Sequence, residues 1–306
     1  MMEPEESQKV NATHLRLRER LEFIEFQLYW TGRLNRIDLM DQFRISPPQA
    51  SADIAQYQEL APGNLDYDTV RKGYVRSQDF TPDLIGRAID RYMMQIVGIE
   101  RGWLRPSDTW LTSLPPVEVV SLERVSNDPE VVMAVLDAIR DASEIEIDYC
   151  SMTGSPATPR SIAPHAMGFA WGRWYVRSWS RDHNDFRDYA MARIVKVHAA
   201  KPRTIDPAGD LEWHHKIDLI LVPNPELEDD RRRAQEIEHR MEDGKLAISC
   251  RLSMAFYLMA EHKLAVTPGK LTPLEQPLVL SNLDEVVQAR EVARKLATQA
   301  LQRASS

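Results

Sequence analysis

Residues 45–60 read ISPPQASADIAQYQEL and predict a helix that begins abruptly after a short turn. Ser46 can cap such a helix, and Pro47 can take its first position, where the missing N–H costs nothing. The apolar residues that would face inward recur at helical spacing; they are Ile54, Tyr57 and Leu60.

Two helices precede this stretch and a hairpin follows it. Residues 13–30 carry Leu and Ile three and four positions apart, which predicts an amphipathic helix that ends at Gly32. Asn35 can cap a short second helix. Residues 64–77 read as strand, turn and strand, with basic residues at the tip. The order helix, helix, turn, helix, hairpin predicts a winged helix-turn-helix.

A domain of this kind places its third helix in the major groove of DNA and its hairpin against phosphates. Glutamine suits that helix because it offers the paired donor and acceptor that the edge of adenine requires. The expected base-reading residues are Ser46, Gln49, Ser51 and Gln56, and the expected phosphate-binding residues are Arg71 and Lys72.

The charge of the N-terminal part limits how tightly it can bind DNA alone. Residues 9–76 carry ten basic and nine acidic residues, so no strong positive patch is present and a single domain would bind weakly. We therefore expect a homodimer on palindromic operator DNA. The alternative is that the three helices and hairpin form a dimerisation or protein-binding module.

Composition places the chain among globular proteins. Its 306 residues are 43% hydrophobic, enough for two or three domains, and no run approaches the eighteen apolar residues of a membrane span. The acidic N-terminus is unlike a signal peptide, so we expect a cytoplasmic protein without a membrane partner. Cys150 and Cys250 give neither a disulfide framework nor a metal spacing, and we expect two buried thiols.

The sequence contains no motif that indicates an enzyme. No phosphate-binding glycine loop and no nucleophile motif is present. His214 and His215 have no carboxylate or cysteine at a metal-ligand spacing. We expect a protein that is not an enzyme and that uses no catalytic residue, metal or cofactor.

A second informative stretch is GRWYVRSW at 172–179. In a strand, Arg173, Tyr175 and Arg177 would share one face. Arg187 and Arg193 lie an even number of residues from Tyr189, so all three would also share one face of a strand. Residues 151–181 contain no Asp or Glu, although the whole chain has a net charge of −8. If these faces converge, they form a basic, aromatic pocket for an anion. The alternative is that the arginines make structural salt bridges, and we expect Trp174 in the core.

Several segments resemble the WYL domain. They are the strand IEIDY (145–149), the segment PRSIAPHAM (159–167), the run GRWYVRSWS (172–180) and FRDYAMARIVKV (186–197). The triplet that names the domain appears here as Trp174-Tyr175-Val176, with Val where the family has Leu. Together with the N-terminal part, the chain resembles the WYL-domain transcriptional regulators, in particular the CapW and BrxR repressors of phage-defence operons.

The resemblance implies a small Sm-like β-barrel with a pocket for a nucleic-acid-derived or nucleotide-like ligand, and a homodimer. Positions that match the family motif are Tyr149, Arg160, Trp174, Tyr175, Arg187 and Arg193. Arg173 also belongs to the expected ligand site because of its place in the strand, and spacing and parity add His165 and Arg177 to it.

The fold class expected is a multidomain α+β chain. Its expected parts are a winged helix-turn-helix DNA-binding domain at 9–77, a helical bridge at 78–125, a WYL ligand-sensing domain at 126–205 and a C-terminal α/β assembly domain at 206–306. The expected function is a ligand-responsive repressor of its own phage-defence operon. The alternative is a nucleic-acid-binding accessory subunit that regulates a nuclease or helicase.

Overall fold

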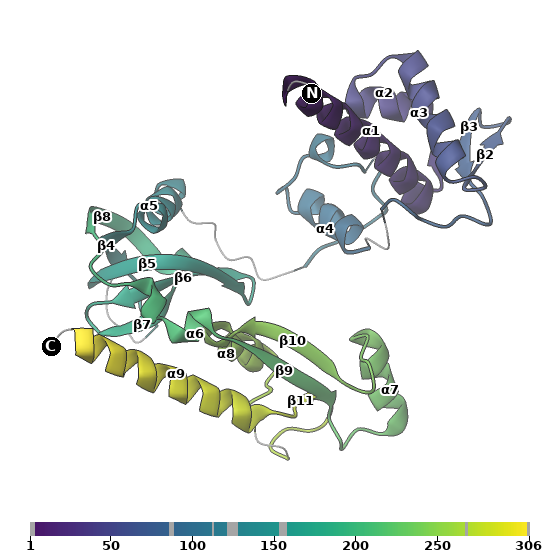
Figure 1. Ribbon diagram of the computed structural model, residues 1–306. Helices are drawn as coiled ribbons and strands as arrows, with labels where there is room; N and C mark the ends of the chain where they lie inside the picture. The colour runs from purple at the N-terminus through teal and green to yellow at the C-terminus, as the bar shows by residue number, and fades with distance from the viewer. Residues whose placement is uncertain are drawn as a thin grey trace. The chain divides into compact units, whose positions relative to one another are not determined.

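The computed structural model describes residues 4–85, 89–111, 113–120, 128–152, 158–266 and 269–304. The chain folds into two compact units, Met1–Leu122 and Glu123–Ser306 (Figure 1). None of the described helices is long and apolar enough to cross a membrane.

The first unit contains the predicted winged helix-turn-helix. Its elements are α1 (Pro4–Thr31), β1 (Arg33–Leu34), α2 (Arg36–Phe43), α3 (Pro47–Leu60), β2 (Leu65–Asp68), β3 (Gly73–Arg76) and α4 (Ile89–Glu100). The strands pair antiparallel in the order β1-β3-β2. The short strand β1, which has two residues, was not expected.

Local signals set the boundaries of these helices. Gly32 has a φ of 74° and ends α1. The N–H of Asn35 donates to the Asp38 carboxylate at 2.6 Å at the start of α2. The Ser46 hydroxyl accepts from the N–H of Gln49 at 3.4 Å and caps α3. The predicted helix starts are therefore confirmed.

Apolar side chains of α1 and α3 form the core of the first unit. Phe23 and Leu28 of α1 pack with Ile54 and Tyr57 of α3, whereas Leu60 is exposed, against expectation. Residues of the expected bridge belong to the same core, namely Ile96, Trp110 and Leu111. The segment 78–125 is thus not a bare connection.

A buried carboxylate of α1 ties α3 to the segment before α4. Glu25 is fully buried and accepts hydrogen bonds from the backbone N–H groups of Asp83, Leu84 and Ile85 at 2.6 to 2.9 Å. Its other oxygen accepts from the Tyr57 hydroxyl at 3.1 Å. Burial raises the pKa of Tyr57, so this phenol remains a donor.

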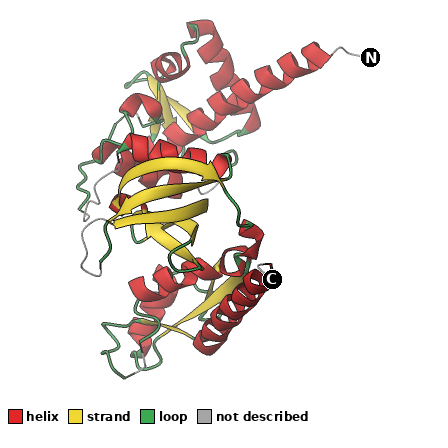
Figure 2. Cartoon of the chain, turned by 90° about the vertical axis from the view of Figure 1, so that its left-hand side faces the viewer, coloured by secondary structure: helices red, strands yellow, loops and turns green. Residues whose placement is uncertain are grey.

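The second unit begins with a helix and a five-stranded antiparallel sheet. The elements are α5 (Pro129–Arg140), β4 (Ser143–Tyr149), β5 (Thr158–Ala170), β6 (Arg173–Ser180), β7 (Asp185–Ala190) and β8 (Ile194–Pro202) (Figure 2). The strand order is β7-β6-β5-β4-β8, and among the described residues no pairing joins β7 to β8. The expected closure into an Sm-like barrel is therefore not confirmed.

One face of this sheet packs against α5. Val131 and Val135 of the helix lie in a core with Ile147, Ile162 and Val176 of the strands. Asp128 caps α5 through the N–H of Glu130, as its Asp-Pro sequence predicts.

A smaller α/β layer completes the second unit. Its elements are α6 (Leu211–His214), β9 (Lys216–Pro223), α7 (Asp229–Glu238), β10 (Leu246–Arg251), α8 (Leu252–Glu261), β11 (Leu278–Leu280) and α9 (Leu283–Ala304). The strands pair antiparallel in the order β10-β9-β11. Leu219 and Leu221 pack with Ala255 of α8 and Val286 of α9, the long helix coloured yellow in Figure 1.

Candidate functional site

The surface of α3 presents polar side chains. Ser46, Gln49 and Gln56 are exposed, and Ser51 is half-buried. The Ser51 hydroxyl accepts from Nη1 of Arg36 at 3.3 Å. Ser46 uses its hydroxyl as the cap of the helix, so its side chain already has a structural role.

The hairpin tip is exposed and basic. The Asp68 carboxylate accepts from the N–H groups of Val70 and Arg71 at 2.8 and 2.9 Å, which shapes the turn. Lys72 has a left-handed φ of 52°. Gly73 packs so closely on the Asn35 side chain at the start of α2 that a Cβ atom there would overlap it. The first residue of β3 thus packs directly against the residue that precedes α2.

A chain of hydrogen bonds holds Gln49 on the helix surface. Its Nε2 donates to Asp53 at 2.9 Å. Asp53 is 1% exposed and accepts from Nε and Nη2 of Arg20 at 2.7 and 3.1 Å. Sequence reasoning missed this chain, because Arg20 is 33 residues from Asp53.

In the second unit, the register of β6 and β7 separates the arginines that were expected to converge. Arg177 lies opposite Asp188, and Arg187 lies opposite Ser178. Paired residues share a face, and neighbours along a strand alternate. Arg187 is therefore on the opposite face of the sheet from Arg177. The pairing therefore does not place all of these side chains on one face of the sheet.

The face of the sheet that packs against α5 also presents a group of basic and hydroxyl side chains. Arg160 and Arg187 both influence His183, whose pKa is lowered by burial and then by these two charges. Arg160 lies 3.8 Å from the Asp182 carboxylate, and Arg187 lies 4.0 Å from that of Asp185. These long ion pairs leave the guanidinium groups weakly neutralised.

Hydroxyl groups line the same patch. The Tyr189 hydroxyl donates to Ser180 at 2.8 Å, and the Ser180 oxygen lies 2.9 Å from Nδ1 of His183. Ser178 is fully buried, and its hydroxyl has no hydrogen-bond partner within the described part of the chain. A buried hydroxyl without a partner is costly. We call Arg160, Ser178, Ser180, His183, Arg187 and Tyr189 the sheet-face patch.

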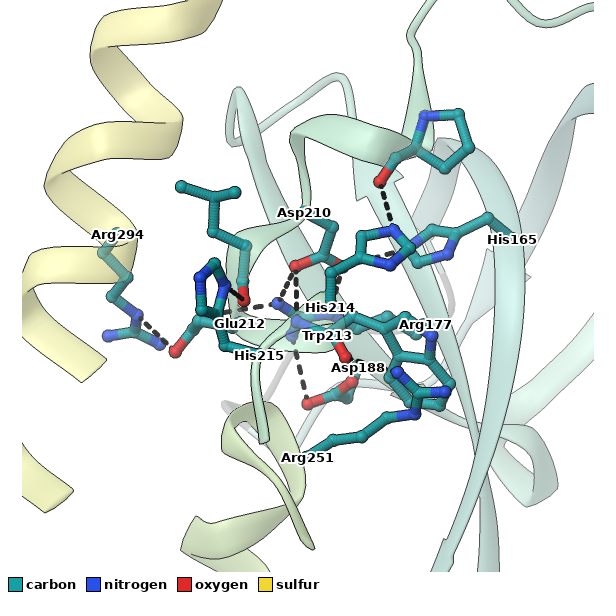
Figure 3. A network of polar contacts seen from close by, with 12 residues as sticks. His165, Arg177, Asp188, Asp210, Glu212, Trp213, His214, His215, Arg251 and Arg294 are labelled. Atoms are coloured by element: carbon teal, nitrogen blue, oxygen red, sulfur yellow. Dashed lines mark hydrogen bonds and ion pairs between the residues drawn. The ribbon is translucent and has the colours of Figure 1, made fainter. Parts of the chain in front are cut away.

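The opposite face of the sheet holds a buried ionic network (Figure 3). Arg177, 3% exposed, donates to Asp210 at 2.7 and 2.8 Å and to Glu212 at 3.1 Å. It also lies 3.4 Å from Asp188. His165 lies 2.9 Å from the Asp210 carboxylate. Arg177 and His165, two expected ligand-binding residues, thus have carboxylate partners, as the salt-bridge alternative predicts.

The network extends to the C-terminal helix. Arg290 and Arg294 of α9 both donate to Oε1 of Glu212, at 2.8 and 3.1 Å. Burial favours the neutral carboxyl of Asp210, but hydrogen bonds from Arg177 and His165 outweigh it and lower the pKa to about 2. Burial raises the pKa of Asp188, which accepts from the Tyr257 hydroxyl at 3.2 Å. This network joins the sheet to α6, α8 and α9.

The other expected ligand residues lie outside the sheet-face patch. Tyr149 is buried and accepts from the N–H of Ala190 at 3.2 Å. Tyr175 is buried against Tyr257, with ring centroids 4.3 Å apart. Trp174 is 52% exposed, so its expected core position is wrong. Arg173 lies over the Trp171 ring at 6.0 Å, and Arg193 is half-buried in the 3-10 turn Met191–Arg193.

A cleft of about 350 Å³ borders the network at the β7 edge. Its lining includes Arg187 and Asp188 of the strand, Tyr257 of α8, and Arg290 and Arg294 of α9. The described residues contain no cluster suited to a metal ion. Cys150 is exposed rather than buried, and Cys250 is half-buried.

Models of protein families match the chain in three places. The BrxR transcriptional regulator winged helix-turn-helix domain matches residues 16–98, the WYL domain matches 130–199, and the BrxR C-terminal dimerization domain matches 216–286. This order of domains defines a WYL-domain transcriptional regulator. All three models describe regulatory domains, as expected for a protein that is not an enzyme.

Relatives identify the family more closely. The DNA-binding transcriptional repressor CapW of Stenotrophomonas maltophilia is 34% identical over 270 residues, which cover 88% of this chain and 90% of that protein. CapW of Escherichia coli and CapW of Pseudomonas aeruginosa are each 32% identical, over 87% of this chain and 89% of the relative. The chain belongs to the family of CapW and BrxR transcriptional regulators.

A likeness among solved structures is weak. Proteasome accessory factor B/C (PafBC) of Arthrobacter aurescens matches with 13% identity and a TM-score of 0.25. The match covers 92% of this chain and 49% of that one, so this chain spans about half the length of that protein.

Removing the buried guanidinium should destabilise the second unit. Arg177→Met would leave the Asp210 and Asp188 carboxylates without their main cation, and we expect a loss of about 3–5 kcal/mol in the free energy of unfolding of this unit. Calorimetry of the full chain would measure it, with Arg231→Met on exposed α7 as the control that changes little. Equal melting of the two variants would contradict a structural role for Arg177.

Acid should destabilise the second unit in a defined range. The folded-state pKa of Asp210 is about 2, below its ordinary value of 3.8. Glu144 of β4 is buried, but hydrogen bonds from Arg181, Ser161 and Lys201 outweigh the effect of burial and lower its pKa from 4.5 to about 2. Their stabilisation is therefore present above about pH 4.5 and is lost as the pH falls towards 2. Melting temperatures measured from pH 7 to 2 should fall mainly in that range, and less so in Asp210→Asn. An unchanged profile in that variant would contradict the assignment.

Proposed function

We propose that this protein is a cytoplasmic, homodimeric repressor that binds operator DNA through α3 and the β2–β3 hairpin. The exposed polar surface of α3, with Gln49 held in place by Asp53, is the observation that supports this most directly. The relatives named above are DNA-binding transcriptional repressors, and the matched C-terminal model describes a dimerization domain. Two copies would place two recognition helices on a palindrome.

We further propose that the sheet-face patch binds a nucleic-acid-derived or nucleotide-like anion and that this binding releases the operator. Arg160 and Arg187 supply charge that their long ion pairs leave weakly neutralised. Ser178 supplies a buried hydroxyl to which a ligand oxygen could bond. Arg177 is assigned no contact with the ligand, because three carboxylates surround it. Repression of a phage-defence operon is the corresponding proposal for the target.

The ligand can change DNA affinity only if it favours one arrangement of the two DNA-binding domains. The buried network offers a route for this effect, since Tyr257 of α8, within the segment matched by the dimerization model, donates to Asp188 of the sheet. Effects on operator and ligand must then be reciprocal.

DNA binding should respond differently to changes at the helix and at the hairpin. Gln49→Ala should weaken binding to the operator selectively, by about 1–3 kcal/mol, because it removes a contact to a base edge. Lys72→Ala should weaken binding to operator and scrambled duplex alike, because it removes a phosphate contact. Footprinting on the DNA upstream of the protein's own gene would locate the operator, and titrations at fixed salt would measure both variants.

The outcome that contradicts the base-reading role is an equal loss on both duplexes for Gln49→Ala. A protein that protects no upstream DNA would contradict the repressor proposal itself. Sedimentation at micromolar concentration should show a dimer, and a monomer with full affinity for a palindrome would rule out the dimeric arrangement.

Binding of an anion should be visible at His183. The charges of Arg160 and Arg187 lower the pKa of this imidazole, so a bound anion that neutralises them should raise it. We expect short single-stranded oligonucleotides or mononucleotides to raise the pKa of His183 in an NMR titration, to raise the melting temperature and to release operator DNA.

Matched variants separate this effect from competition at the DNA-binding surface. Arg187→Ala and Ser178→Ala should abolish or weaken the response to the anion while operator binding is retained. Arg231→Ala on exposed α7 should respond like the wild type. If Arg187→Ala releases DNA as the wild type does, the sheet-face patch is not the ligand site.

A further inference from the structure

We propose that Asp53, a buried carboxylate on the inner side of α3, fixes the orientation of the Gln49 amide and thereby makes Gln49 select adenine over guanine. This inference rests on the proposed function, because it assumes that α3 reads bases. It assigns a positioning role to Asp53 and Arg20, neither of which was expected to affect DNA recognition.

The carboxylate itself is held rigidly. Asp53 is 1% exposed, and the Arg20 side chain that binds it is 14% exposed. Arg20 donates through Nε to one carboxylate oxygen at 2.7 Å and through Nη2 to the other at 3.1 Å. A two-point contact of this kind fixes both the position and the plane of the carboxylate.

An ionised carboxylate can only accept hydrogen bonds, so it imposes a direction on the amide. Nε2 of Gln49 donates to Oδ1 of Asp53 at 2.9 Å. The amide oxygen would be repelled by the carboxylate and must turn away from it. The N–H that lies away from the amide oxygen is therefore the one that bonds Asp53. The oxygen and the second N–H remain together on the other edge of the amide.

That remaining edge has the chemistry of an adenine reader. Its acceptor suits the N6 amino group of adenine, and its donor suits N7, whereas guanine presents two acceptors in the major groove. Gln49 is exposed in the first turn of α3, the part of a recognition helix that meets base edges. Because Asp53 already orders the side chain, less conformational freedom is lost when DNA binds.

The chain Arg20–Asp53–Gln49 makes a specific prediction for Asp53→Asn. The shorter of the two Arg20 contacts, from Nε to Oδ2 at 2.7 Å, requires an acceptor, so the oxygen of the substituted amide would take the place of Oδ2. Its NH₂ group would then take the place of Oδ1, which faces Gln49, and the longer contact from Nη2 of Arg20 at 3.1 Å would be lost. The Gln49 amide would then turn its oxygen inward to accept that N–H, and its NH₂ group would face outward. Two donors suit the two acceptors of guanine, so the base preference should change from adenine towards guanine.

The test is selection of duplexes from a randomised double-stranded DNA library by the full chain. The wild type should select adenine at one position in each half-site, and Gln49→Ala should lose the preference at that position alone. Asp53→Asn should shift the same position towards guanine, with at least about a tenfold change in the adenine-to-guanine ratio. Tyr57→Phe is the matched control: it removes a buried hydrogen bond of α3 and should lower the melting temperature without changing the base preference.

Three other outcomes of the selection would contradict the positioning role of Asp53. Retention of adenine by Asp53→Asn, or no position-specific loss in Gln49→Ala, overturns the inference while the motif of the wild type still supports the proposed function. Absence of any selected motif in the wild type overturns both.

A measurement on the wild type guards against a variant that fails to fold. One Gln49 side-chain amide proton should exchange with water more slowly than those of exposed Gln56 in the DNA-free protein. Equal exchange at the two glutamines would overturn the inference.

Discussion

The second unit depends on one interaction, the burial of the Arg177 guanidinium among the carboxylates of Asp188, Asp210 and Glu212. A buried charge is tolerated only when partners neutralise it, and removal of one partner is far more costly than the pair is stabilising. The interaction therefore commits one face of the sheet to the C-terminal layer. The proposed recognition of an anion would use the opposite face, where the carboxylates paired with Arg160 and Arg187 lie 3.8 and 4.0 Å away.

Sequence signals were sufficient where structure is local. Ser46 with Pro47 predicts the start of α3, and alternation in 145–149 and 172–179 predicts the strands β4 and β6. Sequence signals were not sufficient where the position of a side chain depends on strand register. Alternation divides the residues of each strand between two faces, but it does not show which faces of neighbouring strands coincide. Only the pairing of Arg177 with Asp188 shows that Arg187 lies on the other face of the sheet from Arg177. Partners such as Asp210, 33 residues from Arg177, leave no local signal, and the two-residue strand β1 is too short for any pattern.

Composition also gave a misleading picture of the DNA-binding unit. The near balance of charge over residues 9–76 predicts a weakly basic surface. Glu25, however, is buried and accepts hydrogen bonds from backbone N–H groups and from Tyr57. Asp53 is also buried and accepts from Arg20 and Gln49. These acids act inside the fold, one to seat the segment before α4 and the other to hold a surface side chain. Asp53 and its partner Arg20 remove one charge of each sign from the surface, whereas Glu25 removes one negative charge, so the outer surface is slightly more basic than the count implies.

The last helix of the chain supplies charge to the centre of the second unit. Arg290 and Arg294 stand one turn apart on α9 and reach the same oxygen of Glu212, which is itself bonded to Arg177. During synthesis on the ribosome, the sheet and α6 emerge well before these two arginines do. The ionic junction can therefore be completed only after residues 290–294 have been synthesised, whereas the first unit has its whole core available long before. A nascent chain would possess a folded DNA-binding unit before the second unit, which includes the segment matched by the dimerization model, is complete.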